Sequence, residues 1–164
     1  MENIEVRNSS IGRGTFALKK IIRGEEMLKF TGPVISFEET LTKPLEKQGD
    51  PLQIGPTDYI DTQKPGVFVN HSCAPNAGIK NNKVLVAIND INKGEEIQFD
   101  YSTSMHENCW TLECKCGSTK CRGIVRDFVY LPPVLQKRYL GLNVVQNFIR
   151  TEFTPRNSSS NILY

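Results

Sequence analysis

The sequence predicts a mainly β fold with short helices, and three observations support this class. Short apolar stretches are separated by Gly, Pro and Asn turns over the first hundred positions, which is typical of short strands. Four of the five cysteines lie between positions 109 and 121. Helical spacing of apolar residues is clearest after them. The length of 164 residues suits one domain with a small appendage.

The first strands are predicted over three stretches in the N-terminal third. Residues 11–17 form a Gly-punctuated segment that runs into alternating apolar positions. Residues 22–30 predict a turn that feeds a strand, and Gly32-Pro33 interrupts it before Val34-Ile35 resumes.

A short helix and a loop are predicted next. Ser36 and Glu39 have the spacing of a capping box, so a helix is expected to begin there. Pro44 should end or restart this helix, because proline cannot donate a backbone hydrogen bond. Residues 49–58 are rich in Gly, Pro and Asp and predict a loop, followed by a short strand at 59–61.

A β-hairpin is predicted for residues 78–88, with its turn at Asn81-Asn82, because asparagine tolerates a left-handed backbone. The segments 23–26 and 93–96 both contain Gly-Glu-Glu and precede apolar residues, the second feeding a strand at 97–101. We interpret them as one kind of turn used twice. Adjacent strand residues point to opposite faces, so the paired glutamates are interpreted as solvated turn carboxylates, not as an acid–base pair.

Two helices are predicted near the C-terminus. The first covers residues 132–140, has proline in its first turn and should end near Gly141. A second helix is indicated by the i, i+4 spacing of apolar residues between 144 and 149. Residues 155–161 are polar and expected to be loose.

The composition speaks against several classes of protein. Lys+Arg is 20 and Asp+Glu is 18, a net charge of +2 that does not favour direct nucleic-acid binding. No apolar run approaches the roughly 20 residues needed to cross a membrane. The N-terminus lacks a basic segment leading into an apolar one, so no secretion signal is expected. The odd number of cysteines then indicates reduced thiols in an intracellular compartment, cytoplasm or nucleus.

The clustered cysteines predict a metal site. Three of them fall close together: Cys114, Cys116 and Cys121. Zinc takes four ligands and favours thiolates, so a fourth ligand is needed. Cys109 and His106 are the local candidates, and Cys73 is a distant one. A site closed by four protein ligands has no open position for chemistry, so the zinc would be structural.

Five blocks of the sequence together resemble a known family. They are Ile11-Gly12-Arg13-Gly14, Phe30-Thr31-Gly32 with Val34-Ile35, Asn70-His71-Ser72-Cys73-Ala74-Pro75-Asn76, Gly94-Glu95-Glu96-Ile97-Gln98-Phe99-Asp100-Tyr101, and Cys114-Lys115-Cys116-Gly117-Ser118-Thr119-Lys120-Cys121-Arg122-Gly123. In this order they resemble the signatures of SET-domain protein-lysine methyltransferases, and the last block is similar to the post-SET motif C-x-C-G-S-x-x-C-R-G. Any single block is weak, so the ordered set carries the resemblance.

The resemblance implies an architecture and a reaction. It implies a SET fold of small curved β-sheets with a C-terminal pseudoknot over residues 1–103, a zinc-binding post-SET segment over 104–125, and a helical tail over 126–164 whose last ten residues are flexible. It implies S-adenosylmethionine as methyl donor and a lysine of a protein or peptide, such as a histone or histone-like protein, as acceptor. It also assigns Cys73 as the fourth zinc ligand and leaves Cys109 free.

The resemblance also assigns roles to single residues. Tyr101 matches the catalytic tyrosine, and Phe99 matches the position that tunes how many methyl groups are added. The implied cofactor-binding residues are Ile11, Gly12, Arg13, Gly14, Asn70 and His71. The implied substrate-channel residues are Phe30, Tyr59, Phe99 and Ile124. Phe99 lacks a hydroxyl that would hold a water molecule, which favours di- or trimethylation.

These residue types suit methyl transfer. The acceptor amine must be neutral, yet a free lysine has a pKa of about 10.4. A narrow aromatic pocket disfavours the ammonium form and lowers that pKa. The site then needs orientation of the amine more than acid–base power, and a tyrosine hydroxyl and backbone carbonyls can supply it.

Some positions depart from the family pattern, and other functions stay open. Phe30 stands where the family often has tyrosine, and Val67 stands where histone-directed members often have arginine. One alternative is a catalytically weak SET module that binds a peptide or protein. Another is a zinc-stabilised interaction domain without a cofactor. A dimer through the C-terminal helices is a further open possibility.

Overall fold

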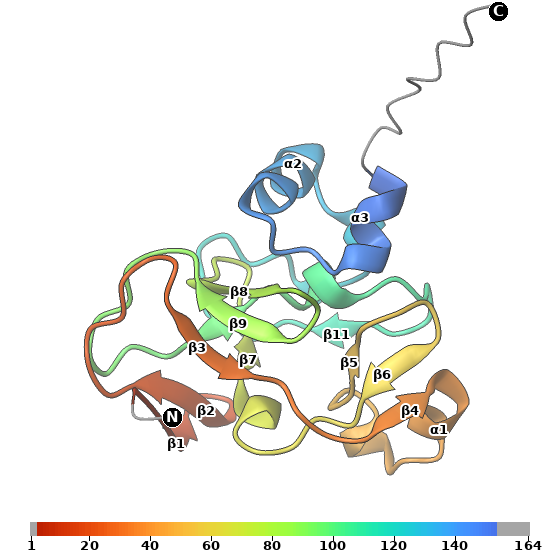
Figure 1. Cartoon of the computed structure of the whole chain (residues 1–164), viewed down its shortest axis with the longest axis horizontal. Coiled ribbons are helices and arrows are strands. Elements are labelled where there is room, and N and C mark those ends of the chain that lie inside the picture. Colours follow the sequence, from red (N-terminus) through yellow and green to blue (C-terminus); the bar gives the residue numbers. More distant parts are fainter. Residues whose placement is uncertain (1–2, 154–164) are drawn as a thin grey trace, which may run out of the picture.

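The computed structural model describes residues 3–153 as a set of small β-sheets joined by short helical segments (Figure 1). The strands are β1 (Ile4–Ser9), β2 (Gly12–Ala17), β3 (Glu26–Lys29), β4 (Val34–Ser36), β5 (Leu52–Gln53), β6 (Asp58–Ile60), β7 (Asn70–His71), β8 (Ala77–Lys80), β9 (Val84–Ala87), β10 (Gln98–Phe99), β11 (Leu112–Glu113) and β12 (Ile124–Val125). The helices are α1 (Phe37–Leu41), α2 (Pro133–Leu142) and α3 (Asn147–Phe153), with 3₁₀ turns η1 (Leu45–Lys47), η2 (Gly66–Phe68), η3 (Tyr101–Ser104) and η4 (Phe128–Tyr130). None of these helices has the length and apolar character that a membrane crossing requires.

The sheets have two or three strands each. The three-stranded sheets have the orders β3-β9-β8 and β4-β6-β5 and are antiparallel. The two-stranded sheets are the antiparallel pairs β1-β2 and β11-β12 and the parallel pair β7-β10. The predicted fold class, mainly β with short helices, is confirmed.

The structure contains the predicted hairpin turn and the predicted capping box. Asn81 and Asn82 have φ of 50° and 62° and join β8 to β9. The capping box is also present, because the Ser36 Oγ accepts from the Glu39 N–H at 3.3 Å and the Glu39 carboxylate accepts from the Ser36 N–H at 2.7 Å.

The Gly-Glu-Glu turn is used twice, as predicted. Gly24 and Gly94 have φ of +96° and +83°, a backbone that favours glycine. Glu25 accepts from the Ile22 N–H at 2.7 Å, and Glu95 accepts from the Asn92 N–H at 2.7 Å. The first glutamate of each pair therefore caps its own turn.

The end of helix α2 agrees with the prediction near Gly141. The helix ends at Leu142, and its C-cap Asn143 has a φ of 57°, a conformation that asparagine tolerates. Two other predictions about elements were wrong in detail. The loop predicted at 49–58 contains β5, which pairs with β6. Helix α3 begins at Asn147, since Val144 and Val145 lie in the buried connection before it. The loose segment expected at the C-terminal end falls outside the described residues.

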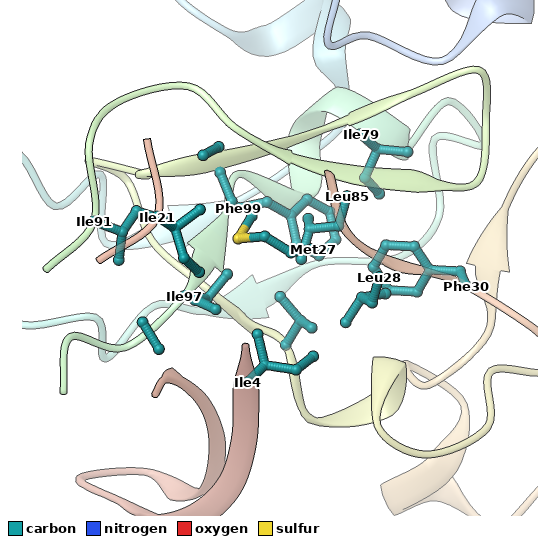
Figure 2. Close-up of a cluster of buried hydrophobic side chains, with 14 of the residues drawn as sticks. Ile4, Ile21, Met27, Leu28, Phe30, Ile79, Leu85, Ile91, Ile97 and Phe99 are labelled. Atoms are coloured by element: carbon teal, nitrogen blue, oxygen red, sulfur yellow. The ribbon is translucent and has the colours of Figure 1, made fainter. Parts of the chain in front are cut away.

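Two hydrophobic clusters hold these elements together. The first lies among the small sheets, and Figure 2 shows Ile21, Ile91 and Ile97 at one end of it and Leu28 and Phe30 at the other. The second fills the space between β9 and the C-terminal helices, which lie over that sheet in Figure 1.

Strand β9 belongs to both clusters. Its Leu85 and Ala87 enter the first cluster and Val86 enters the second, as the alternation of strand side chains requires. The approach is close at Gly78 of β8, where an added Cβ would lie 2.6 Å from the Val144 Cβ. The C-terminal helices are therefore packed against the sheet, not appended to it.

Candidate active site

Two cavities meet at one tyrosine. The first has an empty volume of about 710 Å³, part of it open to solvent, and its aromatic walls include Phe30, Tyr59, Phe99, Tyr101 and Trp110. The second has an empty volume of about 540 Å³, also partly open to solvent, and is lined by Ile11, Asn70, His71, Tyr101 and residues 112–116. Among the described residues, Tyr101 alone lines both. Tyr101 is therefore the residue that the two cavities have in common.

The parallel pair β7-β10 builds this meeting point. Asn70 lies beside Gln98, and His71 lies beside Phe99, although each pair is far apart in the sequence. The Tyr101 N–H donates to the His71 Nδ1 at 3.2 Å, and its hydroxyl donates to the Val69 carbonyl at 2.9 Å. Burial raises the pKa of Tyr101, with the negative charges of nearby carboxylates adding to the effect, so the hydroxyl stays protonated.

His71 connects Tyr101 to the cysteines. Burial lowers the pKa of its imidazole to about 4, so the ring is neutral at pH 7. Its Nδ1 accepts from Tyr101, so the ring proton sits on Nε2, which lies 3.3 Å from the Cys73 Sγ. His71 thus fixes the backbone of the tyrosine and at the same time reaches a candidate metal ligand.

The side-chain amide of Asn70 is held in one orientation. Its Nδ2 donates to the Arg13 carbonyl at 2.9 Å and to the Glu96 carboxylate at 2.7 Å. Both donor hydrogens are thereby used, which leaves Oδ1 as an acceptor. The interpretation of Glu96 as a solvated turn carboxylate was wrong, because it holds Asn70. The neighbouring Gly14 makes room for it, since an added Cβ there would lie 2.2 Å from the Glu96 Oε1.

The first cavity combines aromatic walls with acidic groups. The Phe30 and Phe99 rings meet edge to face at 6.0 Å, and the Phe99 and Tyr101 rings are 4.8 Å apart. Two carboxylates, those of Asp50 and Glu107, also line the cavity, and the described lining residues include no Lys, Arg or His. This combination suits an aliphatic chain that ends in an amine.

Burial affects the ionisable groups at this cavity. It raises the pKa of both carboxyl groups, Asp50 and Glu107, above their ordinary values. The Tyr59 hydroxyl donates to the Glu107 carboxylate, and burial together with that negative charge raises the tyrosine pKa. Tyr59 is therefore a protonated donor that orients Glu107.

Four cysteines gather beside the second cavity. The Sγ atoms of Cys73, Cys114, Cys116 and Cys121 all lie within 4.8 Å of one another, and those of Cys73 and Cys114 are 3.7 Å apart. A zinc tetrahedron with bonds of about 2.3 Å has sulfur–sulfur separations of about 3.8 Å, so the four thiols fit this ion. Cys109 is exposed and is not part of the cluster.

The backbone supports negative charge on these sulfurs. The Arg122 N–H lies 3.4 Å from the Cys73 Sγ, and the Gly123 N–H lies 3.4 Å from the Cys121 Sγ. Such donors around thiolates are typical of metal sites. The sequence spacing left the fourth ligand open between local and distant candidates. In the structure it is the distant Cys73 that lies beside the other three thiols.

The comparisons with known proteins agree with this geometry. A family model described as SET domain matches residues 12–102, more than half of the chain. The chain belongs to the SET domain family. Human "Histone-lysine N-methyltransferase 2B" is 33% identical over 139 residues, covering 74% of this chain and 5% of that protein. Arabidopsis thaliana "Histone-lysine N-methyltransferase ASHH2" is 28% identical over 130 residues, covering 70% of this chain and 7% of that protein. This SET chain therefore spans a small fraction of the length of these relatives.

A solved SET structure has the same fold. The crystal structure of KRYPTONITE in complex with mCHG DNA and SAH aligns with a TM-score of 0.61 and 24% identity, covering 76% of this chain and 29% of that one. The predicted resemblance to the SET family is thereby confirmed at the level of the fold.

The SET fold brings together most residues that the sequence singled out. Ile11, Asn70 and His71 line the second cavity, while Arg13 contributes its carbonyl to the hold on Asn70. Gly12 and Gly14 do not line it. Ile124 is 50% exposed on β12 opposite Glu113 and lines neither cavity.

Some lining residues of this SET domain were missed. Leu112, Glu113 and Lys115 line the second cavity, and their position just before and between the clustered cysteines was the available signal. Asp50 and Trp110 line the first cavity, and they come from connecting segments without a motif.

Proposed function

We propose that this SET domain is a protein-lysine methyltransferase that uses S-adenosylmethionine. The observation that carries the proposal is the position of Tyr101 between an aromatic, acidic cavity and a second cavity lined by Asn70 and His71. An in-line methyl transfer needs donor and acceptor on opposite sides of one small reaction volume. The two cavities provide those sides.

Residues of the second cavity suit the methyl donor. S-adenosylmethionine, when bound, supplies an electrophilic methyl group on a positively charged sulfur. Ile11, Asn70 and His71 would hold the donor, with Gly12, Arg13 and Gly14 shaping the adjoining backbone. The Asn70 Oδ1 can accept from the ammonium group of S-adenosylmethionine, because the Asn70 amide hydrogens already bond Arg13 and Glu96.

Residues of the first cavity suit the acceptor lysine. Phe30, Phe99 and Tyr101 would surround its aliphatic chain and disfavour the ammonium form, so the amine reaches the reaction volume uncharged. Tyr59 would form part of the outer wall. The Tyr101 hydroxyl stays protonated and donates to the Val69 carbonyl, which fixes its oxygen next to the reacting groups. Ile124 is exposed and lies opposite Glu113, a lining residue of the second cavity, so we propose it as a cover for the donor or the substrate.

The clustered cysteines would hold a structural zinc ion. Cys73, Cys114, Cys116 and Cys121 provide four thiolates, so the ion would have no open position for chemistry. Its role would be to fix residues 112–116 at the second cavity. Residues 104–125 would then act as a post-SET segment between the SET domain, 1–103, and the C-terminal helices.

The substrate is proposed to be a lysine in an intracellular protein, such as a histone or a histone-like protein. The names of the two curated relatives support a histone-type substrate. The two carboxylates that line the first cavity, Asp50 and Glu107, support a positively charged segment as substrate.

The test is transfer of a radiolabelled methyl group from S-adenosylmethionine to mixed lysine-rich proteins. Tyr101→Phe keeps the ring and removes the hydroxyl, so the rate should fall by about 100-fold or more, as when one oriented donor is removed from an active site. Tyr130→Phe is the matched control, because its exposed hydroxyl bonds only Asn108 among the described residues.

Two outcomes would separate the alternatives. Full activity of Tyr101→Phe would show that the catalytic assignment is wrong. Donor binding measured by calorimetry, without transfer to any protein, would favour a SET module that acts by binding.

A further inference from the structure

A buried carboxylate lies between the two active-site aromatic residues of β10 and η3. Asp100 is 1% exposed and stands between Phe99 and Tyr101. Arg122 pairs with it in a two-pronged arrangement, Nη1 to Oδ2 at 2.7 Å and Nη2 to Oδ1 at 2.7 Å. Oδ1 also accepts from the Ser102 N–H at 3.2 Å. The Tyr139 hydroxyl donates to Oδ2 at 3.0 Å, and the His71 Nδ1 lies 3.6 Å from Oδ1.

Arg122 connects this carboxylate to the cysteine cluster. It directly follows Cys121, and its own N–H lies 3.4 Å from the Cys73 Sγ. The segment 112–116, which lines the second cavity, belongs to the same short stretch of chain. The Asp100–Arg122 pair therefore ties the short stretch of chain that contains residues 112–116 to the residue before Tyr101.

Tyr139 comes from a part of the chain beyond the SET match. It lies on α2, whereas the family model ends at residue 102. Its side chain is 1% exposed and packs in the second hydrophobic cluster with Phe128 and Val144. A buried hydroxyl needs a partner, and among the described residues that partner is Asp100.

A second contact ties the same region to the active site. The Gln146 N–H, just before α3, donates to the Thr103 carbonyl at 3.0 Å, and Thr103 lies in η3 with Tyr101. The C-terminal helices thus touch the Tyr101 turn at its aspartate and at its backbone.

We propose that Tyr139 is a positioning residue of the active site, which holds Asp100 in the orientation that receives Arg122. The inference rests on the proposed function, because its effect is on the donor cavity. A two-pronged pair requires both carboxylate oxygens to lie in the plane of the guanidinium. Tyr139 restricts Oδ2 through its hydroxyl, which donates to the same oxygen that accepts from the Arg122 Nη1. Helix α2 thereby contributes to seating residues 112–116 at the donor cavity.

The test compares two variants that each lose one phenolic hydroxyl. Tyr139→Phe keeps the packing of the ring and removes the bond to Asp100. Donor affinity measured by calorimetry on the zinc-loaded protein should weaken about fivefold to tenfold, the size expected for one hydrogen bond to a charged group. Zinc transfer to a chromogenic chelator should become several-fold faster by the same reasoning. Tyr130→Phe should change neither quantity.

A double variant asks whether the effect passes through Asp100. Lysine cannot form the two-pronged pair, so Arg122→Lys should weaken donor binding by itself. If Tyr139 acts through the same pair, adding Tyr139→Phe to Arg122→Lys should cause little further loss. Fully additive losses would overturn the proposal.

A purely structural role has a different signature. In that case the unfolding temperature of Tyr139→Phe falls, while its donor affinity and its rate of zinc release match those of Tyr130→Phe. That result would also overturn the proposal. A rise in KM for the donor at nearly constant kcat would support it. If the unaltered protein binds no S-adenosylmethionine, the proposed function fails, while the zinc-release comparison still tests the link from Tyr139 to the cysteine segment.

Discussion

At the scale of single residues, hydrogen bonds fix the orientation of the polar side chains Asn70 and His71 next to Tyr101. The Asn70 Nδ2 donates to the Arg13 carbonyl and the Glu96 carboxylate, which leaves its Oδ1 available as an acceptor. The His71 Nδ1 accepts from the Tyr101 N–H, and its Nε2–H faces the Cys73 Sγ. Such pre-set orientations reduce the rearrangement needed when ligands bind.

Phe99 should set the number of methyl groups added. It is buried between Phe30 and Tyr101, with no polar atom of its own. The unaltered protein should give di- or trimethylated product, and Phe99→Tyr should shift the product toward monomethylation, because the added hydroxyl fills space and can hold a water. Mass spectra of a methylated peptide over a long time course check this. A single added methyl from the unaltered protein would contradict it.

Asp50 should favour peptides with positive charge near the target lysine. Its carboxylate lines the first cavity. Asp50→Asn should raise KM for a peptide with flanking Arg or Lys about threefold to tenfold at low salt, and high salt should reduce the difference. Peptides with neutral flanks should respond less. Glu46→Gln is the control, since this exposed residue of η1 does not line the cavity. An equal change for both peptides would refute the assignment.

At the scale of elements, local turn chemistry was predictable and pairing between distant segments was not. The capping box at Ser36 and the Asn81-Asn82 hairpin each depend on a few adjacent residues, and both were found from the sequence. Strand β5 and the pair β11-β12 have two residues each and form only because a partner strand is present. Such short strands have no periodicity of their own.

The candidate site also has parts that the sequence predicted and parts that it did not. The five blocks contain Asn70, His71, Phe99 and Tyr101, because a motif records residue types at fixed spacing. The contact of Glu96 with Asn70 depends on how β2, β7 and the following turn come together, and the two Gly-Glu-Glu segments look alike in the sequence. The contact of Tyr139 with Asp100 depends on where α2 packs, which no local pattern records.

Gly14 on β2 should be needed to keep Glu96 in place. A Cβ there would lie 2.2 Å from the Glu96 Oε1, so Gly14→Ala should displace the flexible Glu96 side chain and release the Asn70 amide. Donor affinity measured by calorimetry should fall about tenfold, as expected when one partly buried hydrogen bond to a charged group is lost.

Gly141→Ala is the matched control for this substitution. It lies inside α2 with no atom within 4 Å of an added Cβ. Donor affinity should stay unchanged, and the free energy of unfolding should rise by about 0.5–1 kcal/mol, because alanine suits a helix better than glycine. Unchanged donor affinity in Gly14→Ala would show that Glu96 does not position Asn70.

At the scale of the whole molecule, the cysteine cluster joins two distant parts of the chain. Cys73 follows β7, and the other three cysteines lie in the segment between β11 and β12. A bound zinc ion would stabilise the folded state over the unfolded one, because the unfolded chain rarely brings four such ligands together.

Removing zinc should abolish methyl transfer without zinc taking part in the reaction. Chelation should release residues 112–116 from the second cavity, weaken donor binding and lower the unfolding temperature, and added zinc should restore all three. Cys114→Ser should behave like the chelated protein. Cys109→Ser should retain zinc, since that thiol is exposed and outside the cluster. An apo protein with undiminished donor binding and activity would exclude the link.

In the proposed reaction, the position of Tyr101 between two cavities has a consequence for the order of events. The spent donor would leave, and a fresh one would enter, on the side of the second cavity while the modified side chain stays in the first. Successive rounds on one lysine then need no new encounter with the protein that carries it. The number of methyl groups added would then depend on two times, the lifetime of the peptide complex and the time needed to exchange the donor. A peptide that dissociates slowly would accumulate the higher product even at a low concentration of enzyme.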